Sequence, residues 1–146
     1  MKKVMIFKEL ILFIVVTVVL SACKKEKTSS TIVPMDTVDT TAQLKYRGLF
    51  TNGAYGTTMG VVKIYATSNE YSLVLDSFTV NNGPDLHVYI SKEVQPVNFI
   101  DLGVLKATSG TQVYSISAMP DFTQFRYALI HCQQFDHLFG SAVLLP

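Results

Sequence analysis

Short runs of apolar and aromatic residues, each followed by turn-forming residues, fill the chain from Leu44 to Pro146. The runs are rich in Val, Ile, Leu, Tyr, Phe and Thr, and none keeps the 3.6-residue period of an amphipathic helix. Strands of this length and spacing are typical of an antiparallel β-sandwich or barrel, so we predict an all-β fold. The pattern predicts about eight strands, over residues 45–50, 57–66, 72–80, 86–91, 100–105, 112–117, 125–132 and 141–144.

Two of these runs predict which side chains are buried. Within residues 61–66 every second side chain is apolar and the positions between are mixed, which predicts one buried face and one exposed face. Residues 125–132 are apolar on both faces except near the ends of the run. A strand of that kind is expected at the centre of a sheet, covered on both sides.

Turn signals fall between the predicted strands. Gly and Asn tolerate positive φ, and Pro cannot continue a central ladder. At Gly83 we expect a backbone conformation that a side chain would strain. The signals are Asn52-Gly53, Ser68-Asn69-Glu70, Asn81-Asn82-Gly83-Pro84, Ser109-Gly110 and Met119-Pro120-Asp121.

The start of the chain has the features of an export signal. Two lysines follow Met1, residues 10–20 are apolar apart from Thr17, and the sequence then reads Leu-Ser-Ala-Cys up to Cys23. This last segment resembles the bacterial lipobox, in which the cysteine is acylated after the signal is removed. We therefore predict a lipoprotein signal peptide over residues 1–22 and a lipid such as palmitate on Cys23.

An alternative is that the apolar run stays in place as an uncut anchor helix, although a membrane span needs about 20 apolar residues. Both interpretations put the rest of the chain outside the cytoplasm. The predicted location is the bacterial cell envelope, on the periplasmic or the cell-surface face, with the membrane bound through the lipid on Cys23.

The residues after the anchor divide into a tether and a domain. Residues 23–43 are rich in Thr and Ser with scattered apolar positions, which predicts a lipidated cysteine followed by a flexible tether. Residues 44–146 form the predicted β domain. Without the signal, Lys+Arg falls from 12 to 9 and Asp+Glu from 11 to 10, so the net charge is −1. A near-neutral chain argues against a nucleic-acid partner, which needs a basic surface.

Motifs of common enzymes are absent from the sequence. It has no Gly-x-Ser-x-Gly elbow, no P-loop and no His-Glu-x-x-His. The aspartates are dispersed over predicted strand ends and turns, and the sequence alone does not pair any two as acid and base. We do not expect a stand-alone enzyme.

Cysteine and histidine residues near the end of the chain are the strongest candidates for chemistry. With Cys23 carrying lipid, Cys132 is left without a partner for a disulfide. A thiol beside imidazoles can become a redox centre or a ligand for a soft metal, but a buried cysteine can also pack as a small apolar side chain. His131 should point to the opposite face of the strand from Cys132. His137 lies beyond the predicted strand end, from which it could fold back, and His87 is on an earlier strand.

Several segments resemble those of DM13 domains, in the same order along the chain. The most specific are residues 83–91, Gly-Pro-Asp-Leu-His-Val-Tyr-Ile-Ser, and the closing Ile-His-Cys-Gln-Gln-Phe of residues 130–135, followed by Phe-Gly-Ser-Ala. The likeness extends over about Tyr46 to Leu144. It implies a β-rich extracytoplasmic module that acts in electron transfer through its cysteine, either as a bare thiol or as a ligand to a prosthetic group such as haem. Cys132 occupies that position, and His131 stands where an aromatic residue is common.

Three functions are compatible with the sequence. The first is a redox or electron-transfer accessory that uses Cys132, with haem or with no cofactor. The second is a cupredoxin-like copper site made by His87, Cys132 and His137; the expected downstream Met is missing, but a carbonyl can serve as the axial ligand. The third is a β-sandwich that binds a partner protein or a glycan, with Cys132 buried and inert. The sequence does not identify the redox or binding partner.

Overall fold

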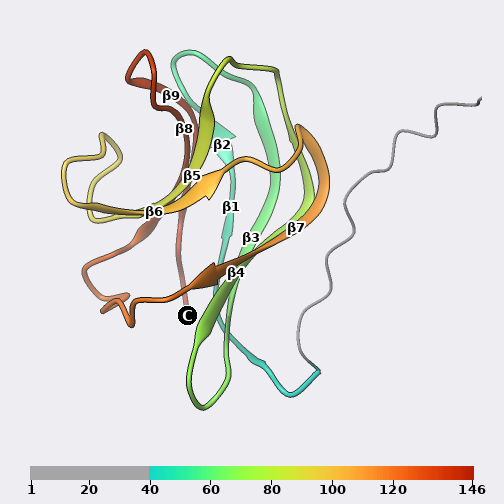
Figure 1. Ribbon diagram of the computed structural model, residues 1–146, viewed down its shortest axis with the longest axis vertical. Helices are drawn as coiled ribbons and strands as arrows, with labels where there is room; N and C mark the ends of the chain where they lie inside the picture. Colours follow the sequence, from blue (N-terminus) through green and yellow to red (C-terminus); the bar gives the residue numbers. More distant parts are fainter. Residues whose placement is uncertain (1–39) are drawn as a thin grey trace, which may run out of the picture. The chain divides into compact units, whose positions relative to one another are not determined.

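The computed structural model describes residues 40–146, and the predicted signal peptide, Cys23 and nearly all of the tether lie outside them. The described residues form two facing antiparallel sheets (Figure 1), which confirms the predicted all-β fold and identifies it as a sandwich. The strands are β1 (Gln43–Leu49), β2 (Thr51–Asn52), β3 (Thr58–Ala66), β4 (Tyr71–Val80), β5 (Leu86–Ser91), β6 (Phe99–Val104), β7 (Ser109–Ile116), β8 (Tyr127–Cys132) and β9 (His137–Val143).

One sheet has the strand order β1-β3-β4-β7 and the other the order β2-β9-β8-β5-β6. Within residues 40–146 there is no helix that is long and apolar enough to cross a membrane.

The core lies between the two sheets and follows the predicted alternation. Val62 and Ile64 of β3 are completely buried, whereas Val61 and Lys63, which alternate with them, point outward. All six residues of β5 are buried, and so are all residues of β8 after Tyr127. These strands are central in the five-stranded sheet, so they are covered on both faces, as the apolar pattern of residues 125–132 predicts.

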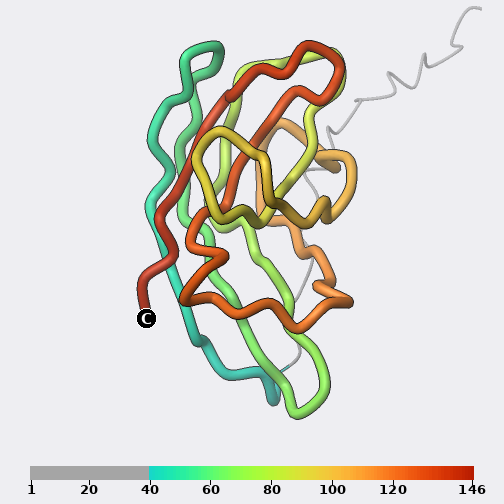
Figure 2. The backbone as a smooth tube through the Cα atoms, turned by 90° about the vertical axis from the view of Figure 1, so that its left-hand side faces the viewer, coloured from blue at the N-terminus to red at the C-terminus, as the bar shows by residue number. Residues whose placement is uncertain are grey.

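The first strands carry the chain from one sheet to the other. β1 pairs with β3, β2 pairs with β9, and the buried Phe50 lies between β1 and β2. On the same side of the sandwich Arg47 and Leu145 exchange two backbone hydrogen bonds, of 2.8 and 2.9 Å. Figure 2 shows the first (teal) and last (red) described segments running side by side. The beginning and the end of the domain therefore join the two sheets along one edge of the sandwich. This edge, where β1 and β2 lie beside β9 and Leu145, is called the seam below.

Three details differ from the sequence-based predictions. β2 is an additional two-residue strand, and β9 begins at His137 instead of Ser141 because residues 133–136 form a tight turn. Ser109 and Gly110 are not a turn but begin β7, where Gly110 has φ +99° at an irregularity in the pairing with β4. Glycine can adopt this positive φ at the irregularity without the strain that a side chain would cause.

The expected strain at Gly83 is also wrong, because its φ is not in the positive region. The residue is constrained by packing instead. A Cβ at Gly83 would lie 2.7 Å from Leu86 Cδ2 and 2.9 Å from Phe139 Cζ, both of them side chains of the core.

Candidate functional site

Cys132 is the last residue of β8, and its side chain belongs to the core. Its Cα is paired with Leu86 on β5 and with His137 on β9. The residue is 0% exposed and is part of the cluster of buried apolar residues. It is a free thiol, and the structure describes no other cysteine. In this position Cys132 packs as a small apolar side chain and has no direct contact with solvent.

His131 points to the other face of the five-stranded sheet, as the alternation along a strand predicts. Its side chain is 4% exposed, and neither ring nitrogen has a hydrogen-bond partner among the described residues. Nε2 lies 3.3 Å from Asp136 Oδ1, within ion-pair range but without the geometry of a hydrogen bond. Burial lowers the pKa of His131, and the charge of Asp136 only partly opposes this effect. The neutral ring is therefore favoured.

His87 is held between two carboxylates on the same outer face. Its Nδ1 lies 2.9 Å from an oxygen of Asp101 on β6, and its Nε2 lies 3.3 Å from Asp85, which precedes β5. The Cα atoms of His87 and His131 are paired across β5 and β8, so the two rings share one face. Sequence reasoning could not pair these groups, because Asp101 meets His87 only through the β5–β6 ladder.

His137 is the first residue of β9 and does not lie beyond the end of the hairpin. The turn folds it back opposite Cys132, where its imidazole stacks on the ring of Tyr55 with centroids 3.6 Å apart. The predicted folding back therefore occurs. The imidazole of His137 is therefore covered on one side by the ring of Tyr55, which lies in the loop between β2 and β3.

Tyr89 is a member of this face that the sequence analysis did not single out. It is almost completely buried, and its hydroxyl accepts a hydrogen bond from Gln133 Nε2 at 3.3 Å. Burial raises the pKa of Tyr89, and the negative charge of Asp101 adds to this effect. Its ring stacks on Phe99 at 4.4 Å and on His131 at 5.5 Å. The sequence carries a signal for this residue, since Tyr89 lies in a mostly apolar strand and a buried tyrosine needs a hydrogen-bond partner for its hydroxyl.

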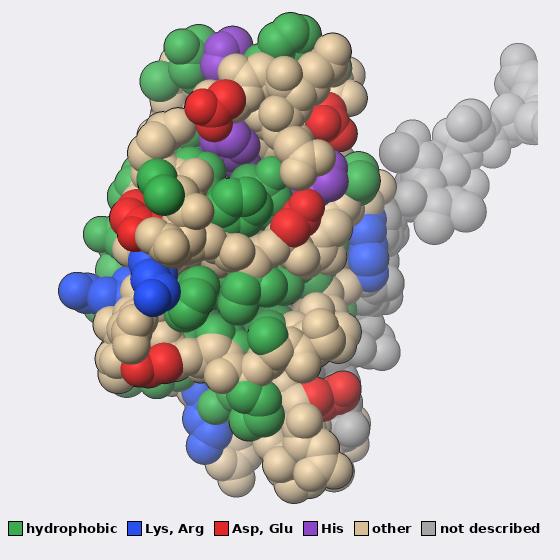
Figure 3. All heavy atoms as spheres, turned by 60° about the vertical axis from the view of Figure 1, so that its left-hand side comes forward, with side chains coloured by type: hydrophobic (Ala, Val, Ile, Leu, Met, Phe, Trp, Pro, Cys, Tyr) green, Lys and Arg blue, Asp and Glu red, His purple; other side chains and the backbone are tan. Residues whose placement is uncertain are grey.

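These residues form an imidazole–aromatic face, defined here as His87, Tyr89, Phe99 and His131, on the outer side of the five-stranded sheet. Figure 3 shows the three histidines of the chain (purple) on one side of the molecule, among carboxylates (red) and apolar side chains (green). Cys132 follows His131 directly but is separated from the face by the sheet itself. Apart from Phe99 the members of the face are buried, and the face does not expose the thiol.

The three residues of the hypothetical copper site do not converge. Cys132 points into the core and His87 points outward, so the two side chains lie on opposite sides of the sheet. Within residues 40–146 no group of three or more His, Cys, Asp or Glu side chains is arranged to hold a metal ion. Haem bound through Cys132 would have to displace the core side chains around it, so the described fold does not fit such a group.

One comparison relates the chain to a known family. The family model described as "Electron transfer DM13" matches residues 49–144, which include β2 to β9 and Cys132. No curated protein and no solved structure matches the chain.

Proposed function

This chain belongs to the DM13 electron-transfer family, and we propose that it is an electron-transfer accessory lipoprotein of the cell envelope in which Cys132 is the redox-active residue. The observation that carries the proposal is the position of Cys132. It is the one cysteine in the segment that the family model matches, and it lies at the end of a central strand. The family description links the chain to electron transfer, and the thiol is the side chain in this segment best suited to a change of redox state.

Burial limits the chemistry that the thiol can perform. An internal disulfide needs a second thiol, which the described residues do not contain. A mixed disulfide with another protein would require the hairpin of β8 and β9 to open, because Cys132 is fully covered. Transfer of one electron, by contrast, does not require the sulfur atom of Cys132 to touch the partner protein. In that step the electron goes to an oxidised metal centre of a partner protein, which is thereby reduced, and the thiol becomes a thiyl radical. Because Cys132 is fully covered, its proton is released to solvent only when the β8–β9 hairpin opens locally.

An oxidative titration of the full-length protein tests this role. Hexachloroiridate, a soluble one-electron oxidant, is added without oxygen, and the equivalents consumed per chain are counted. We expect Cys132→Ala to consume one equivalent fewer than the unaltered protein. Cys23→Ser is the matched control, because it changes the other cysteine and should leave that equivalent in place. Equal consumption by the unaltered protein and Cys132→Ala would refute the assignment.

The envelope location rests on the N-terminal sequence, which lies outside the described residues. A lipid on Cys23 would hold the domain at the membrane, and the tether would let it reach a redox partner protein. The Cys23 substitution described in the Discussion tests this part of the proposal separately.

A second candidate function is a module that binds a protein or a glycan without redox chemistry. The complete burial of Cys132 favours it, because an inert thiol in a core is the common role of an unpaired cysteine. The oxidative titration separates the two functions, since a binding module would lose no redox equivalent when Cys132 becomes alanine.

A further inference from the structure

A groove of 840 Å³ runs along the seam where the chain changes sheets. Arg47, Leu49 and Thr51 line one side, and Ser141, Val143 and Leu145 line the other. The pairing of Thr51 with Ser141, and of Arg47 with Leu145, sets the two rows opposite each other. Side chains two residues apart on a strand share a face, so each row points into the same space.

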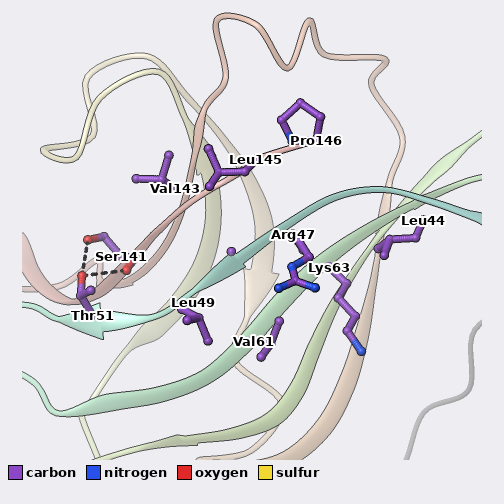
Figure 4. Close-up of a pocket in the computed structure, with 11 residues that line it drawn as sticks. Leu44, Arg47, Leu49, Thr51, Val61, Lys63, Ser141, Val143, Leu145 and Pro146 are labelled. Carbon is purple, nitrogen blue, oxygen red and sulfur yellow. Dashed lines mark hydrogen bonds between the residues drawn. The ribbon is translucent and has the colours of Figure 1, made fainter.

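The composition changes along the groove, as Figure 4 shows. At one end the Thr51 hydroxyl donates a hydrogen bond to the Ser141 carbonyl at 3.1 Å. The middle is apolar, with Leu49 71% exposed and Val143 40% exposed. Arg47 and Lys63, whose Cα atoms are paired between β1 and β3, lie toward the other end. Exposed apolar residues gathered in a concave surface mark a binding site more often than scattered ones do.

The charged side chains that line the groove are both basic. Its lining contains Arg47 and Lys63 and no aspartate or glutamate. Lys63 is bound to Asp76 at 2.6 Å, and this hydrogen bond raises the pKa of Lys63, whereas the nearby charge of Arg47 lowers it. Arg47 itself has neither an ion pair nor a side-chain hydrogen bond within residues 40–146. Asp76 therefore compensates the charge of Lys63, and Arg47 is the lining cation that has no such partner within residues 40–146.

We propose that this groove binds a single-chain amphiphile that carries one anionic end group, a long-chain carboxylate being the representative ligand. The guanidinium of Arg47 would bind the carboxylate through two parallel hydrogen bonds, a geometry that lysine does not offer. The alkyl chain would lie over Leu49 and Val143, toward the two hydroxyl groups. The groove has the volume of a small-molecule site, typically about 300–1,000 Å³. This site is independent of the proposed role of Cys132.

The test uses dodecanoate that carries a photoreactive diazirine at its alkyl end. The full-length protein is held in phosphatidylcholine nanodiscs and irradiated with the probe, and the modified residues are identified by mass spectrometry. We expect cross-links to concentrate on the segments that contain Leu49 and Val143, and to fall at least tenfold in Arg47→Gln. Lys45→Gln is the matched control, because Lys45 is a cation of the same strand outside the groove.

Three further measurements make the result decisive. The matching diazirine alcohol has no charge and should label the groove at least tenfold less than the carboxylate. The circular dichroism spectrum of Arg47→Gln should be unchanged, and Arg47→Lys should recover part of the labelling. Equal labelling by the alcohol, labelling spread over the whole surface, or equal labelling of Arg47→Gln and Lys45→Gln would each overturn the proposal. The proposal would also be overturned if the groove were not labelled because a second copy of the chain covers it.

Discussion

His131 is a polar side chain in a position that supplies it with no hydrogen bond among the described residues. A buried polar group without a partner costs about 1–3 kcal/mol. We predict that His131→Phe will raise the free energy of unfolding by about 1–2 kcal/mol, since it removes that cost and leaves a ring to stack on Tyr89. Urea unfolding measures this change. His137→Phe is the control, because it replaces an imidazole that already stacks on Tyr55, and its effect should stay within about 0.5 kcal/mol.

The same substitution should alter the pH dependence of stability. Burial lowers the pKa of His131 in the folded state, so the unfolded chain binds the proton more readily. The stability of the unaltered protein is therefore complete above a pH of about 6.5 and falls as the pH drops through that value toward the lower folded pKa. The stability gain of His131→Phe should be larger near pH 5 than near pH 8. A gain that shrinks at low pH would show that the charge of Asp136 outweighs burial.

Cys132 gives a second prediction at this scale. A completely buried thiol reacts only when the structure opens, so we expect alkylation in the native state to be at least about a hundredfold slower than in denaturant. Mass spectrometry of the labelled peptide distinguishes Cys132 from Cys23. Rapid labelling under native conditions would mean that the β8–β9 hairpin opens readily, which would make direct thiol chemistry with a partner feasible.

In β3 a backbone irregularity combines a positive φ with close packing. Gly60 has φ +117° at a register shift between Met59 and Val61, and a Cβ there would lie 2.8 Å from Phe78 Cα. Gly103 of β6 has a similar φ of +109°, but a Cβ there would meet nothing within 4 Å. A substitution at Gly103 would therefore report backbone strain alone, whereas one at Gly60 would report strain and steric contact together.

We predict that Gly60→Ala will destabilise the domain by about 3 kcal/mol or more, because strain of about 1–3 kcal/mol adds to the clash with the β4 backbone. Gly103→Ala should cost only the strain. The measurement is urea unfolding of both variants. Equal losses would show that the β3–β4 ladder relaxes enough to admit the methyl group.

Pattern and turn chemistry were sufficient to predict most of the elements. Residues 58–66 and 86–91 are strands close to the predicted bounds, and β8 is central, because alternation and apolar content report burial directly. The start of β9 was missed because His137 and Leu138 follow a turn without glycine. There Asp136 itself adopts φ +53°, a conformation that short polar residues tolerate better than most.

At the scale of the whole molecule, the sequence predicted an all-β sandwich or barrel, and it did not predict the contacts between the residues of the candidate site. Successive side chains of a strand point to opposite faces of the sheet. The opposite orientations of His131 and Cys132 could therefore be predicted from their adjacent positions in one strand. The contacts of His87 with Asp85 and Asp101 depend on ladder register and on which strands are neighbours. Those properties are set by packing over the whole core, and no local pattern encodes them.

The membrane anchor is tested on the complete protein. Cys23→Ser removes the thiol that is predicted to carry lipid, so we expect metabolic labelling with palmitate to disappear and the protein to be released or left unprocessed. Cys132→Ser is the matched control and should label normally. Undiminished labelling of Cys23→Ser would contradict the predicted lipoprotein anchor.

The seam between the first and last strands also has a consequence for biogenesis. The pairing of β2 with β9 cannot form until the chain has emerged as far as Ser141, and the pairing of Arg47 with Leu145 needs four residues more. A chain that leaves a ribosome or a translocation channel from its N-terminal end would have to wait for its last segment before the sandwich closes. For a chain exported as its N-terminal sequence predicts, this late closure would delay completion of the sandwich until the last strands have crossed the membrane.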